Sequence, residues 1–81
     1  NAMVKIDKLS VLDNYKIQLV FSDHTEKTID FKPFIGNDRF TSQLSSMDYF
    51  RKVNVYENGR GIYWPNEYDF CPDFLRNYDA K

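Results

Sequence analysis

The chain has 81 residues, with 11 Lys and Arg against 12 Asp and Glu and a formal net charge of −1 at pH 7. This length predicts one domain, and the scattered basic residues lack the positive footprint of proteins that bind duplex DNA. Because there is one Cys and no apolar run near the roughly 18 residues of a membrane span, we expect a cytoplasmic domain over residues 3–81, preceded by a tag remnant at residues 1–2.

The N-terminal part predicts three antiparallel strands. Two runs rich in β-branched and aromatic residues, Val4 to Val11 and Tyr15 to Phe21, predict the first two strands, and Thr25 to Phe31 predicts the third. The hydrophobic pattern sets a register in which Ile17 lies opposite Ile29. A shift by one residue would bury a charged side chain instead.

The loop before the third strand contains the only histidine of the chain. The predicted register makes His24 the last of three loop residues, in the left-handed backbone conformation that histidine tolerates. A catalytic or metal-binding role is the alternative, because histidine titrates near neutral pH. With one His and one Cys, a zinc site would need two or more carboxylates, so we expect no metal site and no cofactor.

The middle of the chain predicts short helices. Pro33 to Gly36 breaks the strand pattern and indicates a helical turn, and Ser45 and Ser46 are residues that favour a helix start. Apolar residues recur at three- and four-residue steps through this segment, which predicts one or two short helices carrying Phe40, Leu44, Met47 and Phe50.

A hairpin follows the helices. The segments Lys52 to Glu57 and Arg60 to Trp64 flank Asn58-Gly59, which predicts a type I′ turn with positive φ at both central residues. The matching register places Val55 opposite Ile62.

This register also sorts the aromatic residues of the hairpin between its two faces. Trp64 falls on the apolar face opposite Val53, which predicts a core position. Tyr56 and Tyr63 fall on the other face, which needs a covering helix or a partner.

The C-terminal part predicts a turn, an extended segment and a helix. Pro65-Asn66 turns the chain, Tyr68 to Phe70 is extended, and Pro72 with Asp73 begins a helix. Its side chains expected against the sheet are Phe74, Leu75 and Tyr78. The predicted class is α+β, with a three-stranded antiparallel meander, a short helical crossover, a two-stranded hairpin and a C-terminal helix.

The stretch from Ile62 to Leu75, and above all the corner from Trp64 to Asp73, resembles domain-of-unknown-function family 2442. His24 and Glu67 stand where that family has glycine. The resemblance implies a small bacterial α+β protein without an established activity. It also implies gene neighbourhoods that suggest a toxin and antitoxin pair, and an occasional helix-turn-helix domain in longer members, whose DNA role is not carried over to this chain.

Two groups near this corner could carry chemistry. Cys71 precedes a predicted helix start, where a thiolate would be stabilised, but we expect a small, partly buried apolar residue because no base lies near it in sequence. Asp69 and Asp73, with Glu67 close by, could bind a cation or act as paired carboxylates, but we expect helix caps. We therefore predict no catalytic residues.

The surplus of aromatic residues, 17% of the chain, favours contact with a protein partner or a second copy. We expect a non-enzymatic interaction module, in one form the neutralising partner of a small toxin. The first alternative is single-stranded nucleic acid binding, with tyrosines stacking bases and Arg51, Lys52 and Arg60 meeting phosphates, or a DNA-regulatory accessory role. The second is a small enzyme. The predicted interaction residues are Tyr56, Tyr63, Pro65, Asn66 and Tyr68.

Overall fold

The computed structural model describes residues 3–79 and contains two antiparallel three-stranded sheets. The first sheet contains β1 (Ile6–Leu12), β2 (Lys16–Phe21) and β3 (Glu26–Asp30), and the second contains β4 (Asn54–Val55), β5 (Ile62–Tyr63) and β6 (Asp69–Phe70). The helical segments are η1 (Lys32–Phe34), η2 (Ser42–Ser45), α1 (Met47–Phe50) and α2 (Pro72–Asn77). The α+β prediction is confirmed, and the predicted extended segment becomes a third strand of the second sheet, since β6 pairs with β5.

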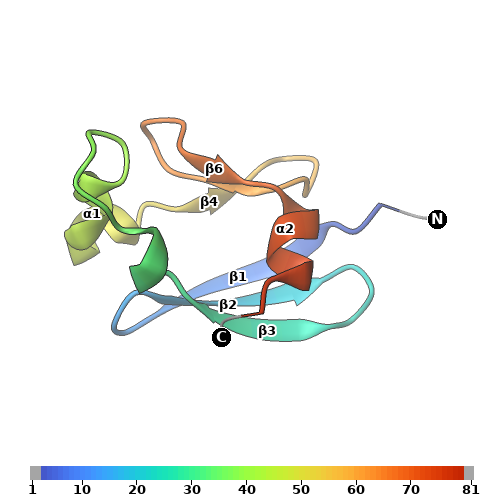
Figure 1. Ribbon diagram of the computed structural model, residues 1–81. Coiled ribbons are helices and arrows are strands. Elements are labelled where there is room, and N and C mark those ends of the chain that lie inside the picture. The colour runs from blue at the N-terminus through green and yellow to red at the C-terminus, as the bar shows by residue number, and fades with distance from the viewer. Residues whose placement is uncertain (1–2, 80–81) are drawn as a thin grey trace.

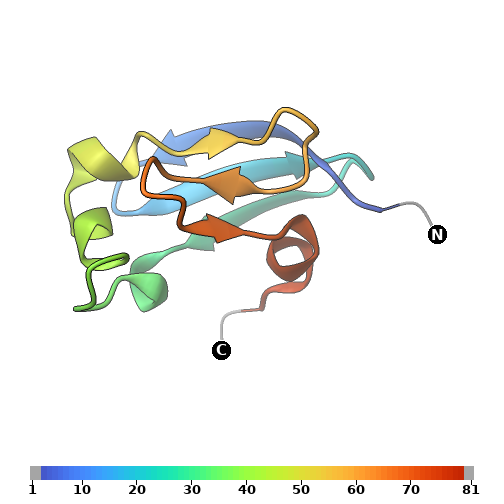
Figure 2. The ribbon, with the colours of Figure 1, turned by 90° about the horizontal axis from the view of Figure 1, so that it is seen from above.

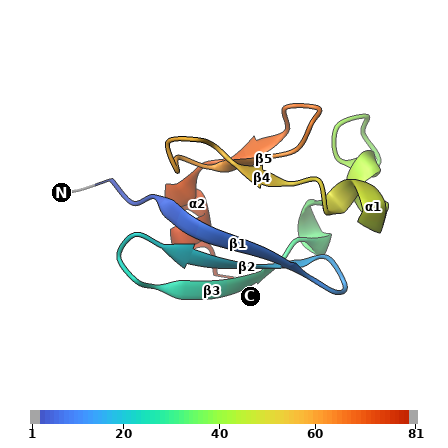
Figure 3. The same cartoon turned by 180° about the vertical axis from the view of Figure 1, so that it is seen from behind.

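The two sheets lie as two layers (Figure 1). Seen from above, the short strands of the second sheet lie over the long strands of the first (Figure 2). From behind, the edge strands β1 and β4 lie on the same side of the molecule (Figure 3), and here the Ile6 N–H donates to the Gly59 carbonyl at 2.8 Å. The helix α2 lies at one end of the layers, and the segment from η1 to α1 lies at the other.

The meander has the predicted register because its inner face is apolar. Ile17, Leu19 and Phe21 alternate along β2 and are fully buried, and Ile17 pairs with Ile29 as predicted. The loop that follows β2 places His24 at φ 71°, which confirms the left-handed conformation.

The first strand boundary lies two residues later than predicted, because β1 begins at Ile6 and continues to Leu12. The turn between β1 and β2 has positive φ at Asn14 (63°) and Tyr15 (62°). This conformation is uncommon for a large side chain. The Tyr15 ring compensates by packing edge-on against Phe50, with the ring centroids 5.5 Å apart, and its hydroxyl donates to the Ser45 carbonyl.

The core lies between the sheets, and Trp64 belongs to it, as predicted. The Trp64 side chain is fully buried, and its Nε1–H donates to the Phe50 carbonyl at 2.9 Å. Ser46 caps α1 by accepting the Tyr49 N–H, which confirms the predicted helix start. The residue that departs from the predicted helical periodicity is Phe40, which lies before η2 and is 46% exposed.

The helix α2 is fastened to the first sheet by a lysine. The Lys27 ammonium on β3 donates to three carbonyls at the end of α2: those of Leu75 at 3.1 Å, Arg76 at 3.0 Å and Tyr78. Carbonyls at the C-terminal end of a helix lack N–H donors from a following turn. The Lys27 ammonium supplies hydrogen-bond donors to these carbonyls. Leu75 is buried, whereas Phe74 is 46% exposed.

The predicted hairpin register is confirmed, since Val55 pairs with Ile62, but the predicted type I′ turn is wrong. Within the described chain, φ is positive at Gly59 (77°) and not at Asn58. The Gly59 N–H donates to the Tyr56 carbonyl at 2.8 Å, which closes a wider loop over residues 57–60. The contact of this loop with β1 overrides the local turn preference, because the Gly59 carbonyl accepts a hydrogen bond from that strand.

Candidate interaction face on the second sheet

Two tyrosine rings stack on the side of the second sheet turned away from the first. Tyr56 follows β4 and Tyr63 belongs to β5, and their ring centroids lie 4.5 Å apart with an interplanar angle of 25°. Both side chains are half-buried. In Figure 1, none of the drawn helices lies over this side of β4 to β6. The pair thus has the placement that the hairpin register predicts.

The position of Tyr56 depends on a glycine and a carboxylate. Its ring lies against Gly61, where an added β-carbon would be 3.2 Å from Tyr56 Cδ2 and 2.6 Å from the Phe70 carbonyl oxygen. The Tyr56 hydroxyl donates to Asp69 Oδ2 at 2.7 Å, and Asp69 lies directly across from Tyr63 in the β5–β6 pairing. The stack is therefore fixed by packing below and by a hydrogen bond at its edge.

Carboxylates give this side of the second sheet a negative charge. The pKa of Tyr56 is raised, first by the hydrogen bond to Asp69, then by partial desolvation and by the negative charges of Asp69, Tyr63 and Glu67 when ionised. Neither Glu67 nor Asp69 takes part in an ion pair among residues 3–79. The ion pairs there join Lys32 with Asp30, Arg60 with Asp73, and Arg76 with Asp23.

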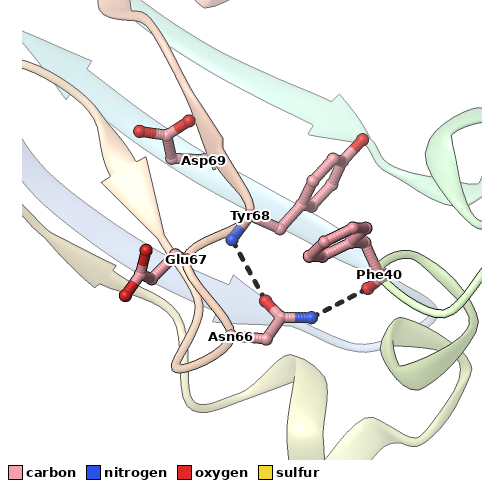
Figure 4. Close-up of a pocket in the computed structure, with 5 residues that line it drawn as sticks. All are labelled: Phe40, Asn66, Glu67, Tyr68 and Asp69. Carbon is pink, nitrogen blue, oxygen red and sulfur yellow. Dashed lines mark hydrogen bonds between the residues drawn. The ribbon is translucent and has the colours of Figure 1, made fainter.

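Asn66 connects the Pro65-Asn66 corner to neighbouring segments of the fold through hydrogen bonds. The Asn66 side chain accepts the Tyr68 N–H at 3.1 Å through Oδ1 and donates to the Phe40 carbonyl at 3.0 Å through Nδ2 (Figure 4). The Asn66 N–H donates to the Tyr49 hydroxyl at 3.0 Å. These bonds tie the corner to the loop before η2, while Pro65 is exposed. The predicted interaction residue Asn66 thus already uses its amide within the fold.

An open pocket of about 450 Å³ lies beside the corner, lined by Phe40, Asn66, Glu67, Tyr68 and Asp69. In Figure 4 the rings of Phe40 and Tyr68 lie on one side of the strand, and the carboxylates of Glu67 and Asp69 point to the other. Burial, and then the charge of Asp38, raise the pKa of Tyr68.

The predicted site therefore divides in two. Tyr56 and Tyr63 stack together, whereas Tyr68 points away from them toward Phe40. Sequence reasoning missed Phe40 as a surface residue. The Gly36-Asn37-Asp38 cluster before it is a loop signal that separates Phe40 from the helical periodicity.

Two predictions for this region are wrong. Cys71 is exposed, because its neighbours Phe70 and Pro72 point into the core and alternation turns the thiol outward. Asp69 and Asp73 do not cap α2: the cap residue Cys71 makes no side-chain cap bond, and Asp73 instead lies 3.5 Å from an Arg60 amino group. Both carboxylates make tertiary contacts, and Asp73 stands in the first turn of α2 after Pro72, as predicted, without capping it.

The remaining candidate residues are dispersed. His24 is exposed on the β2–β3 loop, and residues 3–79 hold no group of three or more His, Cys, Asp or Glu arranged to bind a metal ion. Of the three cations considered for phosphate contact, Arg51 and Lys52 are exposed, whereas Arg60 donates to the Val4 carbonyl and pairs with Asp73. None of the described helices is long and apolar enough to cross a membrane.

Comparison with curated proteins gives no significant match, and neither does comparison with solved structures. The match that exists is to a family, and it covers nearly the whole chain, including both sheets and the corner described above. The chain therefore belongs to the family described as Protein of unknown function (DUF2442), whose sequence model matches residues 6–81.

Proposed function

We propose that this protein is a non-enzymatic protein-interaction module. Its binding surface is the tyrosine face, which we define as Tyr56, Tyr63, Glu67 and Asp69. The observation that carries the proposal is the stacked tyrosine pair, held in place on a sheet side that none of the described helices covers. Tyrosine rings on a rigid surface are typical anchors of protein interfaces. The neutralising partner of a small toxin, suggested by the family resemblance, is one form that such a module can take.

The chemistry of the other candidates supports a binding role over an enzymatic one. Cys71 is exposed at the start of α2, and His24 lies on a separate loop, so no base adjoins the thiol in the hydrogen-bond pattern of residues 3–79. A nucleophile of this kind needs a base within hydrogen-bond reach.

Single-stranded nucleic acid is the less favoured ligand. Stacked tyrosines suit bases, but the carboxylates of Glu67 and Asp69 would repel the phosphates that run beside them. Arg60, one of the cations that such binding would need, is held by Asp73.

Affinity capture from an extract of the native host tests the proposal, using the tagged chain with and without nuclease. Tyr63→Ala is compared with the matched control Leu12→Ala, which removes a 38% exposed side chain from the first sheet. The proposal expects a stoichiometric protein that survives nuclease, that the control retains and that Tyr63→Ala loses while its melting curve stays cooperative. Retention of the partner by Tyr63→Ala would contradict the tyrosine face, and recovery of nucleic acid alone would favour the other ligand.

A further inference from the structure

We infer that the tyrosine face binds an arginine side chain presented by the protein partner. This inference rests on the proposed function and adds the chemistry that the partner must have. It follows from three features of the face: its uncompensated negative charge, the flat aromatic surface beside that charge, and the fixed geometry of both.

The charge of the face calls for a cationic partner. The Glu67 and Asp69 carboxylates point to the same side of the strand (Figure 4), and neither forms an ion pair within residues 3–79. The whole chain carries a formal net charge of only −1, so this negative surface is a local feature. A partner of opposite charge would steer toward it and fix the register of docking.

The stacked rings distinguish arginine from lysine. A guanidinium group is planar, lies flat on an aromatic ring, and can still donate N–H groups sideways to a carboxylate, whereas the lysine ammonium is a compact, strongly hydrated point charge that has no flat surface to stack on a ring. Asp69 lies across from Tyr63 in the sheet and uses Oδ2 to accept the Tyr56 hydroxyl. Its other oxygen, Oδ1, makes no hydrogen bond to the described residues and can accept a guanidinium N–H.

The face needs little rearrangement to bind. Gly61 lets the Tyr56 ring lie close to the sheet, and the hydrogen bond to Asp69 fixes its edge. Side chains that are already ordered lose less entropy on binding, so a flat ring with an adjacent carboxylate is prepared for a guanidinium before the partner arrives.

Fluorescence anisotropy with the full chain tests the inference. The probe is a labelled arginine-glycine repeat peptide, and the matched peptide carries citrulline, which keeps the planar shape but has no charge. We expect the arginine peptide to bind about tenfold more tightly or better. Asp69→Asn keeps an acceptor for the Tyr56 hydroxyl and should remove about the same factor, and Glu67→Gln should weaken binding in the same direction. Asp13→Asn, in the turn of the first sheet, should have no effect.

Equal binding of the two peptides, or an unchanged affinity of Asp69→Asn, would overturn the inference. An equal loss with Asp13→Asn would also overturn it, because the attraction would then be general rather than confined to the face. The two proposals fail separately. If Tyr63→Ala loses the captured partner while the peptides bind alike, the interaction module stands and only the arginine is wrong.

Discussion

Replacing Glu67 by glycine is expected to stabilise the fold. Glu67 has a φ of 74°, and the left-handed conformation costs an L-residue about 1–2 kcal/mol that glycine avoids. Glycine in turn loses about 0.5–1 kcal/mol more backbone entropy on folding, and the middle values of the two ranges leave a net gain of about 0.75 kcal/mol. In a domain of this size that gain raises Tm by about 3–6 °C. The Glu67 side chain makes no hydrogen bond within residues 3–79, so its removal breaks no contact of this kind.

Thermal unfolding followed by circular dichroism, with urea unfolding as a second measurement, gives the answer. Glu67→Gln is the matched control, because it removes the charge but keeps the unfavourable backbone conformation, and its stability should stay within about 0.5 kcal/mol of the parent. A Glu67→Gly variant that melts at or below the parent temperature would refute the argument from φ. If this variant also binds the arginine peptide less well, Glu67 has a binding role that opposes stability.

Three further predictions concern the core and the tyrosine face. Trp64→Ala should lower the free energy of unfolding by about 3–5 kcal/mol, enough to unfold a marginal domain, because the ring is fully buried and its N–H is hydrogen-bonded; an unaltered melting curve would contradict the core role. Gly61→Ala should cost roughly 1–3 kcal/mol in urea unfolding, since its β-carbon would meet the Phe70 carbonyl oxygen at 2.6 Å, and parent-like stability would mean that the strands move apart easily. Tyr56 should ionise above pH 10.0 in an NMR titration, and Asp69→Asn should lower its pKa; an unchanged value would disprove the link. Because its folded-state pKa is raised, the stabilisation from Tyr56 is present below pH 10.0 and is lost as pH rises through that pKa.

The sequence predicts most of the local structure of this protein. Strict alternation along β2 favoured the pairing of Ile17 with Ile29, because a shift by one residue would have buried Asp30 instead. Alternation along the second hairpin strand likewise predicted that Trp64 faces the core and Tyr63 faces away from it. The conformation of His24 followed from the length of its loop. Each of these results depends on neighbours close in sequence or on a period of two.

The errors occur where distant segments meet. The Asn58-Gly59 turn does not adopt the type I′ conformation that its sequence favours, because the Gly59 carbonyl accepts a hydrogen bond from β1. A rule for local turns does not include such a distant contact. The sequence alone does not bring Asp73 to Arg60, which requires the pairing of β6 with β5, or bring Asn66 to the loop that contains Phe40. Cys71 is a local exception: it was expected to be partly buried because no base lies near it in sequence, although alternation along the extended segment turns it outward.

The hydrogen bonds from Lys27 on β3 to the carbonyls at the end of α2 have a consequence for synthesis of the chain. Lys27 is separated by 48 to 51 residues from the carbonyls that it binds, and Arg60 by 56 residues from the Val4 carbonyl. Contacts over such separations form slowly, since a long loop must close before they stabilise anything. The meander can pair as it leaves the ribosome, but its apolar face is not fully covered until the second sheet and α2 have emerged. During translation that face is the surface most exposed to aggregation or to chaperones.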